Sequence, residues 1–127
     1  MRDEQKLEHL TAALYVSGAT FIVGLPAMML WVWPSAWSWT PSQLEYEQMI
    51  IGIYATLGVF LIRAAKDPLA NVSLIWFTIW SSIVHGGIML TQAVADEAER
   101  AHLLGDAPAL FLVVFVLWYL IPKKAVA

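Results

Sequence analysis

The stretch LTAALYVSGATFIVGLPAMMLWVW, residues 10–33, decides the fold, because it is long, apolar and free of charged side chains. A helix that crosses a bilayer needs about 20 mostly apolar residues. The stretch exceeds the roughly 7–15 apolar residues of a signal-peptide core, and it lacks a convincing cleavage site. We therefore expect a retained membrane helix here.

Three further apolar stretches follow the first. The predicted spans cover residues 10–33, 46–63, 71–95 and 107–122. Prolines at 34 and 122 end the first and fourth helices, and Asp67-Pro68 begins the third. A capping box at 40–43, Thr-Pro-Ser-Gln, begins the second. Good helix formers after residue 92 predict that the third helix extends outward to about residue 104.

Composition supports a membrane protein and excludes several other classes. The 127 residues are 60 % hydrophobic and 13 % charged, so we expect one integral membrane domain over residues 1–127. Short connections favour antiparallel neighbours, and the predicted fold class is an all-α, four-helix transmembrane up-down bundle. The absence of cysteine excludes disulfides and thiolate metal sites. No clustered basic footprint for nucleic acid is present.

The basic residues predict the orientation of the bundle. Cytoplasmic loops of membrane proteins carry an excess of lysine and arginine. Arg100 stands alone on one predicted side, which also holds most of the acidic side chains. The other side holds Arg2, Lys6, Arg63, Lys66, Lys123 and Lys124. We therefore expect both termini in the cytoplasm and a multi-pass protein of the bacterial inner (plasma) membrane.

Four tryptophans lie close together around the end of the first span, at positions 31, 33, 37 and 39. Tryptophan prefers the headgroup region of a membrane, so an interfacial anchor explains them. An aromatic rim for a ligand or partner is the alternative.

One face of the third helix is polar. Thr78, Ser82, His85, Met89 and Gln92 follow one another at spacings of three or four residues and form one stripe. Polar groups in a membrane helix are expected to face the protein interior, where they find hydrogen-bond partners. The sequence therefore predicts that this stripe is buried.

The second helix carries a face of small and polar residues, which lets membrane helices approach closely. This face consists of Gln48, Gly52, Ala55, Thr56 and Val59. Antiparallel packing would bring His85 near the stretch from Gly52 to Thr56, and Gln92 near Gln48. We therefore expect the second and third helices to pack through these two faces.

His85 admits four roles. It can be a neutral imidazole hydrogen-bonded to Ser82, Thr56 or a backbone carbonyl. It can be an axial ligand of haem, since Gly86 and Gly87 leave room beside it and Met89 lies one turn away. It can relay protons, although no acid is expected at mid-membrane. It can also contact a quinone or another lipid-soluble ligand. The candidate ligand-binding residues are His85, Ser82, Thr78, Met89, Gln92 and Thr56.

An acidic group is predicted on the side opposite the termini. Asp96, Glu99, His102 and Asp106 fall near one face of the expected helix extension, with Glu45 and Glu47 on the same side. These residue types can bind a divalent cation. A solvated helix extension with Asp106 as a cap is the simpler interpretation.

Three groups of residues resemble a family of small bacterial integral membrane proteins of unknown function. They are the stretch 63–68 (RAAKDP), the stretches 73–77 and 81–86 (SLIWF and SSIVHG), and the turn 102–106 (HLLGD). The resemblance covers roughly the second half of the chain. It implies a four-span layout and supplies no activity.

No catalytic motif is present, and we expect a non-enzymatic protein. The function predicted first is a scaffold or accessory subunit, acting as a homo-oligomer in the lipid bilayer or with other membrane subunits. A cofactor- or quinone-binding redox protein centred on His85 is the second hypothesis, with haem or quinone as the group bound. A proton or ion conductor is the third. The sequence requires no cofactor and identifies no metal.

Overall fold

The computed structural model describes residues 2–37 and 44–122, in which every regular element is helical. The first span comprises α1 (Asp3–Ala19), the π-helix η1 (Thr20–Gly24), α2 (Leu25–Ala27) and the π-helix η2 (Met28–Val32), followed by the short α3 (Pro34–Trp37). The remaining elements are α4 (Leu44–Ala65), the 3₁₀ helix η3 (Pro68–Asn71), α5 (Val72–Ala95), the 3₁₀ helix η4 (Glu97–Leu103) and α6 (Asp106–Leu120).

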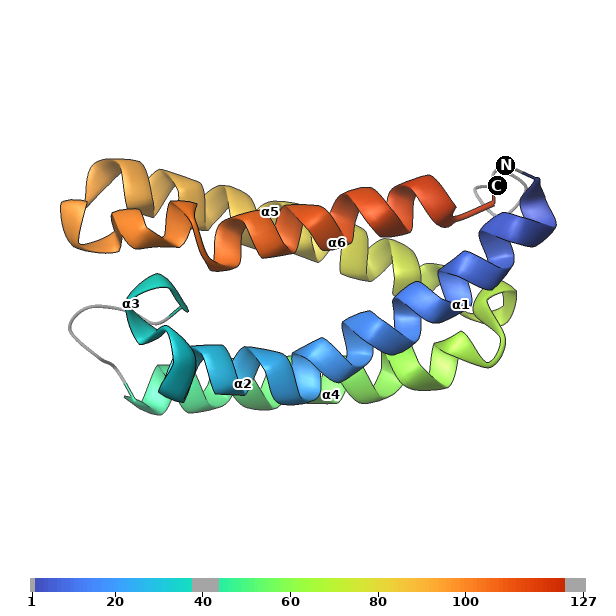
Figure 1. The fold of residues 1–127 in the computed structure, drawn as a ribbon, viewed down its shortest axis with the longest axis horizontal. Helices are drawn as coiled ribbons and strands as arrows, with labels where there is room; N and C mark the ends of the chain where they lie inside the picture. Colours follow the sequence, from blue (N-terminus) through green and yellow to red (C-terminus); the bar gives the residue numbers. More distant parts are fainter. Residues whose placement is uncertain (1, 38–43, 123–127) are drawn as a thin grey trace.

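Among the described residues, four helical stretches are long and apolar enough to cross a membrane: Asp3–Val32, Glu45–Ala65, Pro68–Ala95 and Glu97–Leu120. This confirms the all-α, four-helix membrane fold. The start of α1 and the end of α6 lie at the same end of the bundle (Figure 1). There the Lys6 ammonium lies 5.2 Å from the centre of the Tyr119 ring. The assignment of this end to the cytoplasm stays a prediction, and Lys123 and Lys124 lie outside the described residues.

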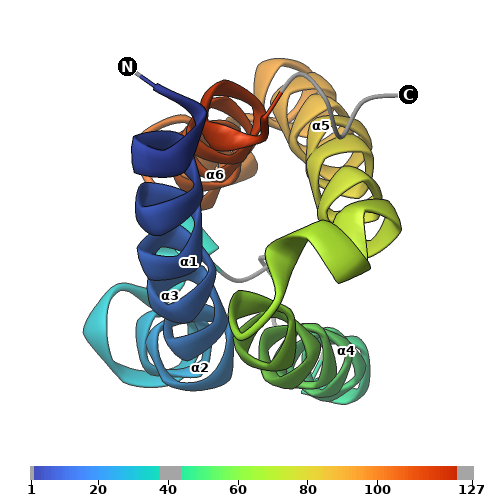
Figure 2. The same cartoon turned by 90° about the vertical axis from the view of Figure 1, so that its right-hand side faces the viewer.

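The bundle is built from two helix pairs. α1 packs against α4, and α5 packs against α6, whereas α4 and α5 touch at few points (Figures 1 and 2). The first pair is close because of two glycines: a Cβ atom on Gly18 would lie 2.6 Å from the Gly58 carbonyl oxygen, and a Cβ on Gly58 would lie 2.6 Å from that of Gly18. Small residues permit such close approach of membrane helices.

The end of the bundle where α1 begins and α6 ends is filled by apolar side chains. We call it the closed end. Leu10, Leu14, Leu61, Ile75 and Leu117 are each 0 % exposed there. They come from all four long helices and belong to one contiguous cluster. We call the opposite end, which holds α3, η4 and the starts of α4 and α6, the open end.

The first span is not one regular α-helix. Pro26 lies inside it and has no N–H to donate to the preceding turn. The chain adopts π-helical hydrogen bonding on both sides of α2, and the Leu25 N–H donates to the Thr20 carbonyl. The prediction of a helix over this span is confirmed, but its irregularity at the open end was not predicted.

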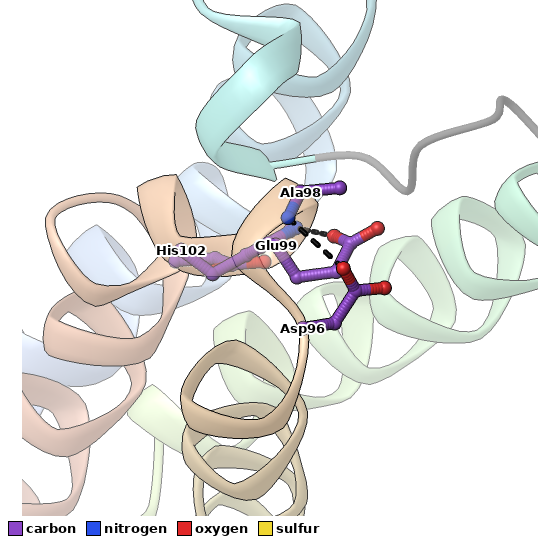
Figure 3. Close-up of polar contacts among 5 residues, drawn as sticks. Asp96, Ala98, Glu99 and His102 are labelled. Carbon is purple, nitrogen blue, oxygen red and sulfur yellow. Dashed lines mark hydrogen bonds and ion pairs between the residues drawn. The ribbon is translucent and has the colours of Figure 1, made fainter.

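The predicted α-helical extension of the third helix to about residue 104 is wrong. α5 ends at Ala95, and Asp96 has an extended conformation with φ −125° and ψ 116°. The Asp96 carboxylate accepts a hydrogen bond from the Ala98 N–H at 2.9 Å and begins η4 (Figure 3). η4 then packs against α3 and α5. Packing of buried polar groups in η4 overrides the local helix propensity.

The predicted packing of the second helix on the third through its small-residue face is wrong, although His85 does lie against Tyr54, within the predicted stretch from Gly52 to Thr56. Gly52 and Thr56 lie on an exposed face of α4, and the Thr56 hydroxyl donates to the Gly52 carbonyl at 2.9 Å. α4 instead packs on α1 through Gly58. Gln48 and Gln92, which were expected to meet, are both exposed. The capping box at 40–43 and Trp39 lie outside the described residues.

Candidate functional site

A cavity of about 260 Å³ occupies the open end between the two helix pairs. Its wall is apolar over most of its area, and α1, η1, α4, α5 and α6 all contribute to it. The polar residues in the wall are Ser17, Thr20, Trp37, Tyr54, His85 and Asp106. The cavity therefore combines an apolar volume with a small set of hydrogen-bonding groups, which is typical of small-molecule sites.

His85 is held by Tyr54. The Tyr54 hydroxyl and His85 Nδ1 form a hydrogen bond, and their ring centres lie 5.5 Å apart. Phe21 packs edge-on against Tyr54 with ring centres 5.1 Å apart. The expected partners of His85 were Ser82, Thr56 or a backbone carbonyl, so the partner is a different one. The bond joins α4 to α5 where the two helices otherwise touch little.

The polar stripe of the third helix is buried along most of its length. Thr78 is 0 % exposed, Ser82 is 1 % exposed and Met89 is 5 % exposed, whereas Gln92 is exposed. The Thr78 hydroxyl donates to the Leu74 carbonyl at 2.9 Å, so its hydrogen-bond partner lies within α5. His85 and Met89 both line the cavity. The structure thus brings these two candidates together and places Gln92 outside.

The room beside His85 is partly filled. A Cβ atom on Gly86 would lie 2.9 Å from two carbons of the Phe111 ring, so this glycine accommodates α6. Around Gly87, by contrast, a Cβ would meet no atom within 4 Å. The expectation that both glycines leave space for a macrocycle is therefore wrong for Gly86.

A buried triad links η4 to the cavity. His102 Nδ1 lies 2.7 Å from Asp106 Oδ1, and His102 Nε2 lies 2.8 Å from Glu99 Oε2. All three residues are at most 6 % exposed. Glu99 and His102 lie on one turn of η4, beyond the end of α5 (Figure 3). The interpretation of this region as a solvated helix extension is wrong, because its central residues are buried.

The chemistry of the triad follows from its donors and acceptors. Ionised carboxylates accept hydrogen bonds but cannot donate them. His102 therefore bonds to two such groups only when both ring nitrogens carry hydrogen, and otherwise one carboxyl group carries the proton. The triad can hold an exchangeable proton. Within residues 2–37 and 44–122, no group of three or more His, Asp and Glu side chains is arranged to hold a metal ion.

α3 closes the cavity beside the triad. A Cβ atom on Gly105 would lie 2.5 Å from the Ala36 carbonyl oxygen and 3.0 Å from Trp37 Nε1, so a side chain at this position would push α3 away. Trp37 Nε1 is buried and has no hydrogen-bond partner among the described residues. Trp31 is 77 % exposed and Trp33 is 39 % exposed, and their role as interfacial anchors stays a prediction. Trp37 differs from them because it lines the cavity.

The sequence analysis did not single out Ser17, Thr20 or Tyr54 as cavity residues. It placed Asp106 in the acidic group and not in a cavity with His85. A tyrosine inside an apolar span is a signal, since its hydroxyl needs a partner. Asp106 was interpreted as a helix cap, because it directly follows a turn glycine.

Comparisons with known proteins give a family and no activity. A search of curated proteins and a search of solved structures both found no match. Residues 5–126 match the family described as Family of unknown function (DUF6632). The match extends the resemblance seen in the second half of the sequence to nearly the whole chain. Because this match covers nearly the whole chain, the protein belongs to this family of unknown function.

Proposed function

We propose that the protein binds a lipid-soluble molecule with a polar head group in the cavity at the open end, with quinones as the model class. The observation that carries this proposal is one apolar cavity whose wall holds the hydrogen-bonded pair Tyr54–His85. The apolar wall suits a hydrocarbon body or ring, and the pair suits a carbonyl or hydroxyl head.

The position of the cavity supports entry from the membrane. Val16 on α1 and Leu112 on α6 both line the cavity, yet they are 66 % and 63 % exposed. They mark a rim between α1 and α6 at the height of the apolar spans. A molecule dissolved in lipid would enter through this rim without crossing water.

The polar groups complement a carbonyl head. Because Tyr54 occupies His85 Nδ1, Nε2 is the ring nitrogen left for a ligand, and it donates or accepts according to the tautomer. The buried N–H of Trp37 is a second donor in the same wall. Among the described residues this N–H has no partner. A buried donor left unpaired is unfavourable by about 1–3 kcal/mol, and a ligand oxygen would relieve this.

The other hypotheses from sequence have less specific support. A scaffold or accessory role, alone or in a homo-oligomer, stays a prediction. Conduction of protons or ions needs a polar path through the whole bundle. The closed end is instead filled by an apolar cluster, in which five side chains are 0 % exposed. Haem ligation by His85 and Met89 stays an alternative, since both line the cavity.

A titration tests the proposal. Purified protein in detergent micelles is titrated with decylubiquinone, and bound quinone is measured by equilibrium dialysis against protein-free micelles. We expect saturable binding that His85→Ala and Tyr54→Phe weaken, with Thr56→Ala as the matched control, because Thr56 is exposed on the same helix as Tyr54. Equal binding by all four proteins, or none by the wild type, would refute the quinone class. A visible absorption band lost in His85→Ala would favour haem.

A further inference from the structure

The buried triad points away from the cavity toward the surface of the open end. Asp106 lines the cavity, His102 lies between the two carboxylates, and Glu99 lies on the far side of the ring. The Glu99 side chain keeps 8 % exposure, and its neighbours on η4 are open to solvent: Glu97 is 85 % exposed and Arg100 is 58 % exposed. The three groups therefore form a line from the cavity to the solvent-facing turn η4.

We propose that Asp106, His102 and Glu99 form a proton-exchange route between the cavity and the aqueous face at η4. His102 and Asp106 form a hydrogen bond of 2.7 Å, and His102 Nε2 lies 2.8 Å from Glu99 Oε2 as an ion pair. Both distances are short enough for a proton to pass without a water between the side chains. Imidazole suits the central position, because it can take a proton at one nitrogen and release another from the second.

A proton moves from Asp106 to water in three steps. A protonated Asp106 gives its proton to His102 Nδ1, so that the O–H bond breaks and an N–H bond forms. His102 Nε2 then releases its proton to Glu99 Oε2, and Glu99 passes a proton to water. The imidazole is left neutral, with its proton on Nδ1. A ring flip, or passage of a proton in the reverse direction, restores the first tautomer.

Two further titratable groups face the cavity. Tyr54 from α4 and His85 from α5 line it together with Asp106. On the aqueous side lie Asp96, Glu97 and Arg100. Glu47, at the start of α4, is also buried at the open end. A molecule bound in the cavity that gains or loses protons at its head, as a quinol does, would use this route.

The inference rests on the cavity of the proposed function but not on its ligand. The test is therefore made on the ligand-free protein reconstituted in lipid. Protons are released from a photolabile acid in the surrounding water, and time-resolved infrared spectroscopy follows the carboxyl band that Asp106→Asn removes. We expect this band to rise promptly in the wild type.

Two variants keep the shape of the route but break proton transfer. His102→Gln retains hydrogen-bonding capacity without a titrating ring, and Glu99→Gln leaves the His102–Asp106 pair in place. We expect each to slow the rise of the Asp106 band about tenfold or more, since a positioned proton-transfer group contributes roughly 10²–10⁴-fold to a rate. Glu97→Gln, exposed on the same turn, is the matched control and should leave the rate unchanged.

Two results would overturn the route. One is a wild-type spectrum with no pH-dependent band assignable to Asp106, because a carboxylate that never takes a proton cannot pass one on. The other is a wild-type rate in both His102→Gln and Glu99→Gln. Prompt exchange together with failed decylubiquinone binding would keep the route and reject the proposed ligand, so the two failures are distinguishable.

Discussion

The closed end and the open end of the bundle are made from the same four helices but are packed in opposite ways. At the closed end, leucine, isoleucine and alanine side chains from all four helices fill the interior. At the open end, π-helical segments, a short helix and a 3₁₀ turn replace regular helix, and a cavity with buried polar groups remains. The difference indicates that tight apolar packing is concentrated at the closed end, and that the open end holds the cavity in which we propose that a ligand binds.

The largest expected effect is at the buried triad. His102→Leu leaves Glu99 and Asp106 buried without their shared partner, and removing one member of a buried ion pair destabilises a protein by about 3–5 kcal/mol. Arg100→Gln on the same turn breaks an exposed pair with Glu97, N···O 3.6 Å, and we expect a change below about 1 kcal/mol. Chemical unfolding in mixed micelles measures both. Similar losses for the two variants would contradict the burial of the triad.

The next effect concerns the glycines of α4. Gly58→Ala places a Cβ atom 2.6 Å from the Gly18 carbonyl oxygen, and we expect a loss of about 1–3 kcal/mol from overpacking. Gly52→Ala is the control, because a Cβ there meets nothing within 4 Å and alanine is the better helix former. Thermal unfolding should rank Gly52→Ala at or above the wild type. If Gly52→Ala were the more damaging change, α4 would pack through the face predicted from sequence.

A pair of alanines compares the two ends directly. Ala64 at the closed end is 1 % exposed, so Ala64→Leu should destabilise the bundle by about 2 kcal/mol. Ala109 lines the cavity, where Ala109→Leu has space to enter and should leave the melting temperature unchanged or raise it. Differential scanning fluorimetry of both variants checks this. Equal destabilisation would mean that the open end is as tightly packed as the closed end.

The smallest effect is expected for the hydroxyl of Tyr54. Tyr54→Phe removes its hydrogen bond to His85 while keeping the ring on Phe21, and such a bond between membrane helices contributes about 0.6–2 kcal/mol. Thr56→Val, whose hydroxyl bonds within its own helix, should change stability less. The comparison is made by unfolding in the same micelles. Equal stability of the two variants would mean that this hydrogen bond does not help to hold α4 against α5.

The membrane spans could be predicted from the sequence, but the pairs of helices that pack together could not. Hydropathy and prolines locate the helices because membrane crossing depends on composition and length. The burial of Thr78 and Ser82 also follows, since polar groups avoid lipid. By contrast, α4 carries two glycines, Gly52 and Gly58, on different faces, and local sequence gives no reason to prefer Gly58. That preference depends on Gly18, which lies far away along the chain.

Only part of the site could be predicted, because most of its residues are brought together by contacts between different helices. His85 stands out by its type alone, as one ionisable side chain in an apolar span. Its partner Tyr54 and the cavity residue Asp106 come from other helices, so their roles depend on tertiary packing. The turn at 97–103 shows the limit most clearly. Its residues favour an α-helix, yet contacts of Glu99 and His102 give a 3₁₀ helix that folds back.

The most direct test of a ligand site at the open end is to identify what the protein carries from its own membrane. Wild type, Ala109→Leu and Ala64→Leu are purified under the same mild conditions, and bound small molecules are extracted and compared by mass spectrometry. We predict one class of lipid-soluble molecule that accompanies the wild type and Ala64→Leu and is depleted in Ala109→Leu. The same extract from all three proteins, containing bulk membrane lipid alone, would contradict the account.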